Sequence, residues 1–78
     1  MRYNDIKSPF RAPPSHPYRT VARIDPADHR RVERFVEGRP ELRLLGAENG
    51  QRDEWAVHVG CASERVRADF DEWVYNTF

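Results

Sequence analysis

A chain of 78 residues allows a single domain, and its 13 basic residues are balanced by 13 acidic ones. This balance excludes the basic excess that marks most nucleic-acid-binding proteins. The only cysteine, Cys61, excludes an internal disulfide, and one cysteine with three histidines lacks the paired ligand spacing of a structural zinc site. We therefore expect no metal ion and no cofactor, and a small core that association with a partner would help to stabilise.

The sequence predicts neither a targeting signal nor a membrane span. No apolar run in the first twenty residues is long enough for a signal sequence, and no later segment approaches the length of a membrane-crossing helix. A single thiol also suits a reducing compartment. We therefore expect a cytoplasmic protein that does not enter a membrane.

Residues 1–17 are predicted to form a proline-rich arm ahead of a single domain that spans residues 18–78. Proline fixes φ and lacks a backbone donor, so regular helix or central strand is disfavoured here. The prolines of the arm are Pro9, Pro13, Pro14 and Pro17. The arm either packs across the domain through Tyr3, Ile6 and Phe10 or is partly disordered.

The domain is predicted to open with a strand over residues 18–24, which is rich in β-formers. A helix over residues 26–37 follows, because Asp25 is a suitable N-cap and Pro26 suits the first helical position. Gly38 is expected just beyond its end. The apolar stripe of this helix contains Val32, Phe35 and Val36.

The second half of the chain is predicted to hold a hairpin and a helix. Residues 41–45 and 54–61 are expected to be strands around an Asn49-Gly50 turn, with a bend at Gly60. Ser63 is the expected N-cap of the second helix. The apolar stripe of that helix contains Val66, Phe70, Trp73 and Val74, and residues 75–78 form a short aromatic tail.

The predicted order is β-α-β-β-α, an α+β fold. A right-handed crossover makes the first two strands parallel, and the hairpin places the third strand between them, with both helices on one face. Over about residues 18–75 this arrangement resembles the ferredoxin-like βαββαβ fold without its last strand. The resemblance is one of architecture and implies no activity.

The residues do not assemble a recognisable catalytic motif. Cys61 and His58 are three positions apart on one predicted strand, so they point to opposite faces and do not form a nucleophile–base pair. Glycine-rich phosphate loops and nucleophile-elbow patterns are lacking. We therefore expect a protein that is not an enzyme.

The sheet face opposite the helices is the first candidate binding surface. It is expected to present Arg19, Arg23, Arg43 and His58 with small apolar patches. Arginine can stack on bases and pair with phosphates, so single-stranded nucleic acid is one ligand for this face. An acidic protein surface is another, and a plain solvated sheet face is the third interpretation.

The second predicted helix provides two further candidates. Asp69, Asp71 and Glu72 crowd its C-terminal half, where negative charge opposes the helix dipole, and they serve either a basic partner or solubility. Tyr75 and Phe78 are aromatic anchors for an interface, or they clamp the arm through Phe10.

The function expected from these patterns is a small non-catalytic protein–protein interaction module. By analogy with small chains of phages and mobile elements, it would inhibit or modulate a larger complex. Two alternatives remain open: nucleic-acid binding through the arginine-bearing sheet face, and self-assembly into a homodimer through the edge at residues 18–24.

Overall fold

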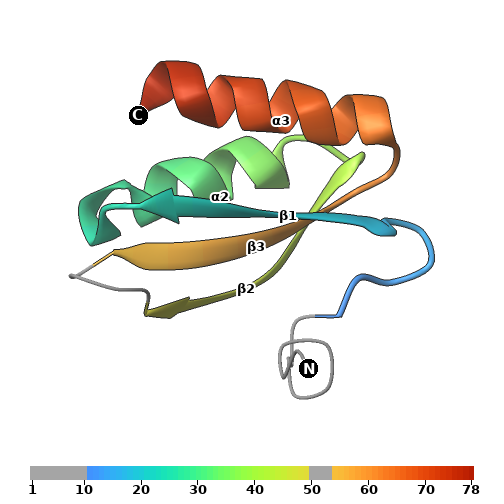
Figure 1. Cartoon of the computed structure of the whole chain (residues 1–78). Coiled ribbons are helices and arrows are strands. Elements are labelled where there is room, and N and C mark those ends of the chain that lie inside the picture. Colours follow the sequence, from blue (N-terminus) through green and yellow to red (C-terminus); the bar gives the residue numbers. More distant parts are fainter. Residues whose placement is uncertain (1–10, 50–53) are drawn as a thin grey trace, which may run out of the picture.

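A computed structural model describes residues 11–49 and 54–78 of the chain, which form a mixed α+β fold (Figure 1). The elements are β1 (Tyr18–Ile24), η1 (Pro26–Asp28), α2 (His29–Glu37), β2 (Leu42–Asn49), β3 (Trp55–Cys61) and α3 (Glu64–Thr77). The sheet is three-stranded, with β3 between β1 and β2 and antiparallel to both. Both helices cover one face (Figure 1). Predictions about residues 1–10 and the Gly50 turn lie outside the described residues.

Both helices begin where the sequence predicts, but by different means. The first helical segment opens with the 3₁₀ turn η1, in which the Asp28 amide bonds the Asp25 carbonyl, and the Asp25 side chain makes no capping bond. At α3, by contrast, Ser63 Oγ accepts a 3.2 Å hydrogen bond from the Val66 amide. Gly38 is the C-cap of α2 itself and has right-handed backbone angles.

The second strand is longer than predicted and contains an irregularity. It runs to Asn49 rather than ending at Leu45. Leu44 pairs with Val59 while Gly46 pairs with His58, so that Leu45 is an additional residue on β2. A bulge of this kind shifts the alternation of side chains beyond it by one position.

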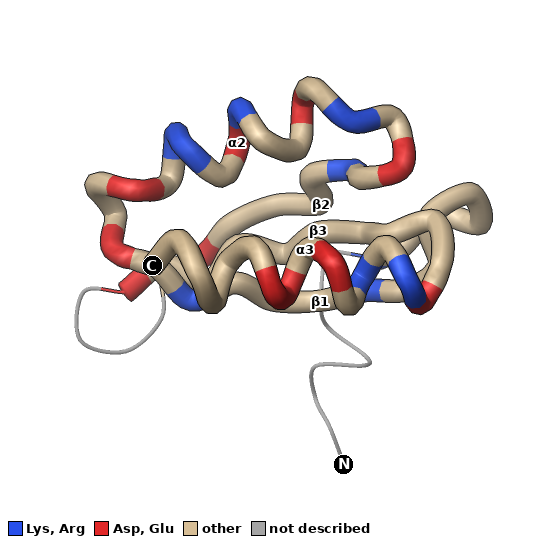
Figure 2. Tube along the Cα trace, turned by 90° about the horizontal axis from the view of Figure 1, so that it is seen from above, with Lys and Arg blue, Asp and Glu red and all other residues tan. Residues whose placement is uncertain are grey.

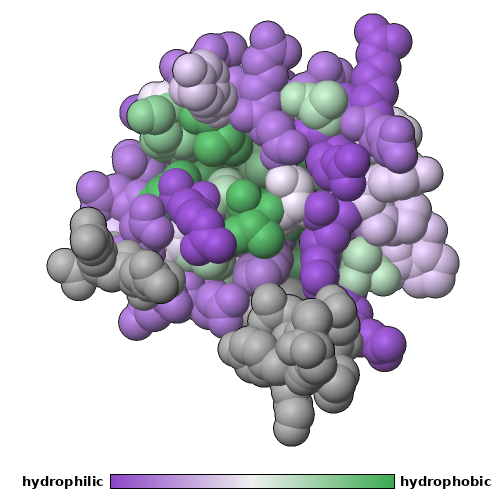
Figure 3. All heavy atoms as spheres, viewed as in Figure 1, coloured by the Kyte–Doolittle hydropathy of each residue, from purple (hydrophilic) through white to green (hydrophobic). Residues whose placement is uncertain are grey.

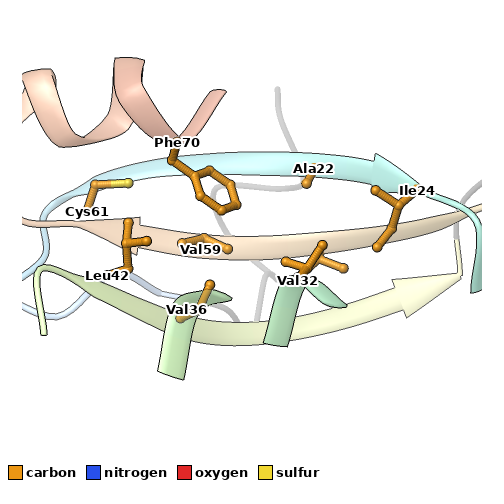
Figure 4. Packing of buried hydrophobic residues seen from close by; sticks show 9 residues of the cluster. Ala22, Ile24, Val32, Val36, Leu42, Val59, Cys61 and Phe70 are labelled. Atoms are coloured by element: carbon orange, nitrogen blue, oxygen red, sulfur yellow. The ribbon is translucent and has the colours of Figure 1, made fainter. Parts of the chain in front are cut away.

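The core lies between the helices and the sheet (Figure 4). Val32 and Val36 of α2 and Phe70 of α3 point toward the strands. The buried strand residues are Ala22, Ile24, Leu42, Val57, Val59 and Cys61. Phe35 stacks on Trp73 with ring centroids 3.8 Å apart, which joins the two helices to each other.

The segment before β1 folds back over the sheet face that the helices leave open. The His16 amide bonds the Pro13 carbonyl in a turn, and His16 Nε2 bonds the Pro40 carbonyl at 2.9 Å. A Cβ added to Gly60 would lie 3.0 Å from the His16 carbonyl oxygen. The expected bend at Gly60 is therefore wrong: β3 continues through it to Cys61, and the glycine admits a crossing backbone.

Candidate functional site

β1 forms one edge of the sheet: among the described residues it pairs with β3 on one side and with no strand on the other. Alternate residues of a strand direct their backbone N–H and C=O groups to opposite sides. The Ala62 amide donates a hydrogen bond to the Glu41 carbonyl, so the backbone groups of Ala62 face β2. By alternation, the backbone groups of Cys61 face β1. Cys61 lies opposite Tyr18, so Tyr18 faces β3. The residues whose backbone groups face outward are therefore Arg19, Val21 and Arg23.

The flank of α3 runs along this edge and contacts it at successive turns. Figure 2, seen from above, shows that α3 overlies β1, whereas α2 lies toward the β2 side of the same helix layer. The Arg67 guanidinium lies 5.9 Å from the centre of the Tyr18 ring. One turn further along α3, Thr20 Oγ1 donates a 2.6 Å hydrogen bond to Asp71 Oδ1. These two contacts hold the edge strand against the helix.

Beyond Thr20 a hollow lies between β1 and α3, and the small residue Ala22 is part of its lining. The hollow has a volume of about 330 Å³. We call it the β1 groove, and it is lined by Thr20, Val21, Ala22, Arg23, Asp71, Val74 and Tyr75.

Two exposed hydrophobic residues border the β1 groove: Tyr75 on the helix side, and Val21, whose side chain lies on the sheet face away from the helices. The large hydrophobic side chains left exposed among the described residues are Val21 (39 %), Tyr75 (85 %) and Phe78 (43 %). Two of them, Val21 and Tyr75, line this groove. Figure 3, in the orientation of Figure 1, shows hydrophobic surface in the region of β1 beneath α3, surrounded by hydrophilic side chains. An apolar patch with a polar rim is typical of interaction sites.

The predicted acidic cluster does not form one surface. Asp71 lines the β1 groove, whereas Asp69 lines a separate hollow between the two helices. Glu72 is exposed on α3. Because successive residues turn by about 100° around a helix, side chains two positions apart point to different flanks.

The predicted aromatic tail is divided in the same way. Tyr75 belongs to α3, which extends to Thr77, and lies on the β1 side. Phe78 packs edge-on against Trp73 with centroids 5.7 Å apart, and its ring lies 5.9 Å from the Arg31 guanidinium. Phe78 therefore contacts the helix layer, and Tyr75 is the exposed aromatic of the pair.

The arginine-bearing sheet face is partly covered and partly neutralised. Arg19 and Arg43 lie on either side of Gly60, which is buried beneath His16. His58 Nε2 lies 3.1 Å from Glu48 Oε2 on the same face. Arg23 is exposed at the rim of this face, beside the β1 groove. The sheet face thus carries a carboxylate among its cations.

The second hollow, between α2 and α3, was not anticipated from the sequence. It has a volume of about 210 Å³ and lies over Leu42 and Phe70. The Arg39 guanidinium covers one side, 4.2 Å from the centre of the Phe35 ring. The only signal for it in the sequence is the spacing of Phe35 and Arg39, which places both residues on one side of a helix end.

Cys61 lies fully buried beneath α3. Burial, and then the negative charge of Asp71, raise the pKa of its thiol to about 11, with the charge of Arg67 acting in the opposite direction. The thiol is therefore protonated at neutral pH, where only a thiolate is nucleophilic.

Within residues 11–49 and 54–78, no group of three His, Cys, Asp or Glu side chains could hold a metal ion. No helix in the same ranges is long and apolar enough to cross a membrane. Comparison of the chain with protein-family models, curated proteins and solved structures finds no match.

Proposed function

We propose that this protein is an interaction module that binds another protein by adding a strand to its sheet along β1. The observation that carries the proposal is that the outer edge of β1, which no other described strand pairs with, carries exposed Val21 and borders a groove lined by exposed Tyr75. In strand addition, backbone hydrogen bonds at a free edge give affinity, and pockets for alternate side chains give specificity. At β1, the outward backbone groups and the adjacent groove provide these two features at the same place.

The geometry of β1 favours this use over a passive edge. Natural proteins protect free edges with short strands, prolines, bulges, charged side chains or a covering helix or loop. β1 is seven residues long, pairs with β3 without a shift of register and has no proline within it. Its length, regular register and lack of proline therefore leave β1 able to accept a further strand, and its outward arginines restrict which strand can pair.

The proposal is tested by removing one outward backbone donor. The Val21 amide faces away from β3, so Val21→Pro removes a donor for an added strand and leaves the β1–β3 hydrogen bonds in place. Val21→Thr is the matched control, because it keeps the amide and a β-branched side chain. Circular dichroism and thermal unfolding of both variants check that the sheet is retained.

Tagged full-length protein is used to capture partners from a nuclease-treated lysate of its native cells. We expect a defined protein to be retained by the wild type and by Val21→Thr, and to be lost with Val21→Pro. Tyr75→Glu should weaken the same capture, and it provides a side-chain test if the proline variant is unstable. Retention that is equal for all variants would contradict the proposal, and retention that requires nucleic acid would favour the arginine-bearing face instead.

A further inference from the structure

The charges around the β1 groove point to the chemistry of the partner. Resting on the proposed function, we propose that the groove binds an extended acidic segment of another protein, antiparallel to β1. An added strand presents side chains to both faces of the sheet. Each face of β1 therefore sets its own requirement for the residues of the incoming segment.

On the face away from the helices, β1 presents Arg19, Val21 and Arg23 in alternation. Residues directly opposite on neighbouring antiparallel strands have Cβ atoms about 5 Å apart, and opposite charges at such positions attract. Arg23 pairs with Ala56 of β3, and Ala56 pairs in turn with Glu48 of β2. The Glu48 carboxylate contacts His58 Nε2 at 3.1 Å. Arg23 therefore favours an acidic residue at the first position of the incoming segment and Val21 an apolar one at the third. An acidic residue at the fifth position would lie on the row of Arg19.

On the helix side, the residue opposite Ala22 would enter the groove, which Val74 and Tyr75 also line. An apolar side chain of medium size fits there. The residue opposite Thr20 lies near the Asp71 carboxylate, which disfavours another acid and accepts a hydrogen bond from a hydroxyl. For an antiparallel strand these requirements give the pattern Glu-Leu-Val-Thr-Glu.

The same charges disfavour a second copy of this chain as the occupant. In the fully overlapped antiparallel pairing of two β1 strands, Arg19 of each copy would lie opposite Arg23 of the other. Like charges directly opposite each other are destabilising. Charge complementarity therefore selects an acidic strand from a different protein.

The probe is an acetylated and amidated peptide, Thr-Glu-Leu-Val-Thr-Glu-Thr, and its control carries lysine in place of both glutamates. Each is titrated into the ¹⁵N-labelled full chain while the amides of Arg19, Val21, Arg23 and Tyr75 are followed by NMR. We expect the acidic peptide to bind about tenfold more tightly than the lysine peptide, since the peptide residue opposite Arg23 changes from an opposite to a like charge. The Arg23→Glu variant should lose most of this preference, and Arg34→Glu, which reverses an exposed arginine of α2, should retain it.

Equal binding of both peptides at these amides would overturn the acidic preference and leave strand addition standing. Failure of both peptides to shift these amides would also overturn the acidic preference. In that case, loss of partner capture with Val21→Pro would still support strand addition. If the same amides shift with protein concentration in the absence of peptide, a second copy occupies the edge and the inference is wrong.

Discussion

The hydroxyl of Thr20 is joined to the carboxylate of Asp71 by a 2.6 Å hydrogen bond that ties the edge strand to α3. The two residues are far apart in the sequence, and both line the β1 groove. It therefore holds the two walls of the groove at a fixed separation.

Removal of this bond should cost a modest amount of stability. Because both groups are accessible to water, we expect Thr20→Val and Asp71→Ala each to lower the free energy of unfolding by about 0.5–1 kcal/mol, and the double variant to lose less than the sum. Urea unfolding of the three variants measures this coupling. Asp69→Ala, on the opposite flank of α3, is the control and should change stability by less than about 0.5 kcal/mol. Strict additivity would show that the bond contributes nothing.

The close approach of His16 to Gly60 predicts a second result. In Gly60→Ala the new Cβ would lie 3.0 Å from the His16 carbonyl oxygen and 3.1 Å from the His16 Cβ. His16 is held by its bonds to Pro13 and Pro40, so it cannot move freely. We expect a loss of about 1–2 kcal/mol, which exceeds the gain that replacing a glycine gives through the unfolded state.

Gly38→Ala is the matched control for this substitution. The nearest atom to its added Cβ is the Arg34 carbonyl oxygen at 3.7 Å, an ordinary contact, and its backbone angles are right-handed. Here the effect on the unfolded state dominates, and we expect a gain of about 0.5 kcal/mol. Thermal unfolding compares the two variants. Equal effects at both glycines would contradict the role of His16.

The two N-cap residues, Asp25 and Ser63, give a third prediction, because only Ser63 makes a side-chain capping bond. Ser63→Ala removes the bond to the Val66 amide and should cost about 1 kcal/mol. Asp25 makes no capping bond, so Asp25→Ala should cost at most about 0.3 kcal/mol, through its interaction with the helix dipole. Urea unfolding of the two variants gives the comparison. A larger cost for Asp25→Ala would mean that its side chain caps the helix in solution.

Local patterns in the sequence predict most of the secondary structure of the described residues. The alternation in residues 18–24 marks a strand, and β1 has the same bounds. The apolar stripes of both helices identify the residues that meet the sheet, including Val32 and Phe70. The separation of Asp69 from Asp71 also follows from their spacing, since side chains two positions apart on a helix do not share a face.

The groove could not be predicted in the same way, because it depends on contacts between distant segments. Its hollow is lined by residues of both β1 and α3, including Ala22 and Val74, so it requires the register of β1 against α3. The irregularity at Leu45 depends on pairing with β3, which no local pattern specifies. The contact of His16 with Gly60 joins a loop to a strand across 44 positions.

The buried thiol of Cys61 makes the stability of the protein depend on alkaline pH. Burial and the charge of Asp71 raise its pKa from 9.0 to about 11 in the folded protein. Between these two values the unfolded chain loses the proton and the folded chain keeps it, so the free energy of unfolding falls as pH rises. We expect a loss of about 1–3 kcal/mol across this interval, complete above the folded pKa.

Urea unfolding of the wild type and of Cys61→Ala at a series of pH values from 8 to about 11 tests this dependence. The variant lacks the thiol and keeps every other ionisable group, so the difference between the two curves reports the thiol. We expect that difference to change from about pH 9 upward and to be constant below it. Parallel curves throughout would mean that the thiol ionises equally readily in both states, and that Cys61 is reached by water beneath α3.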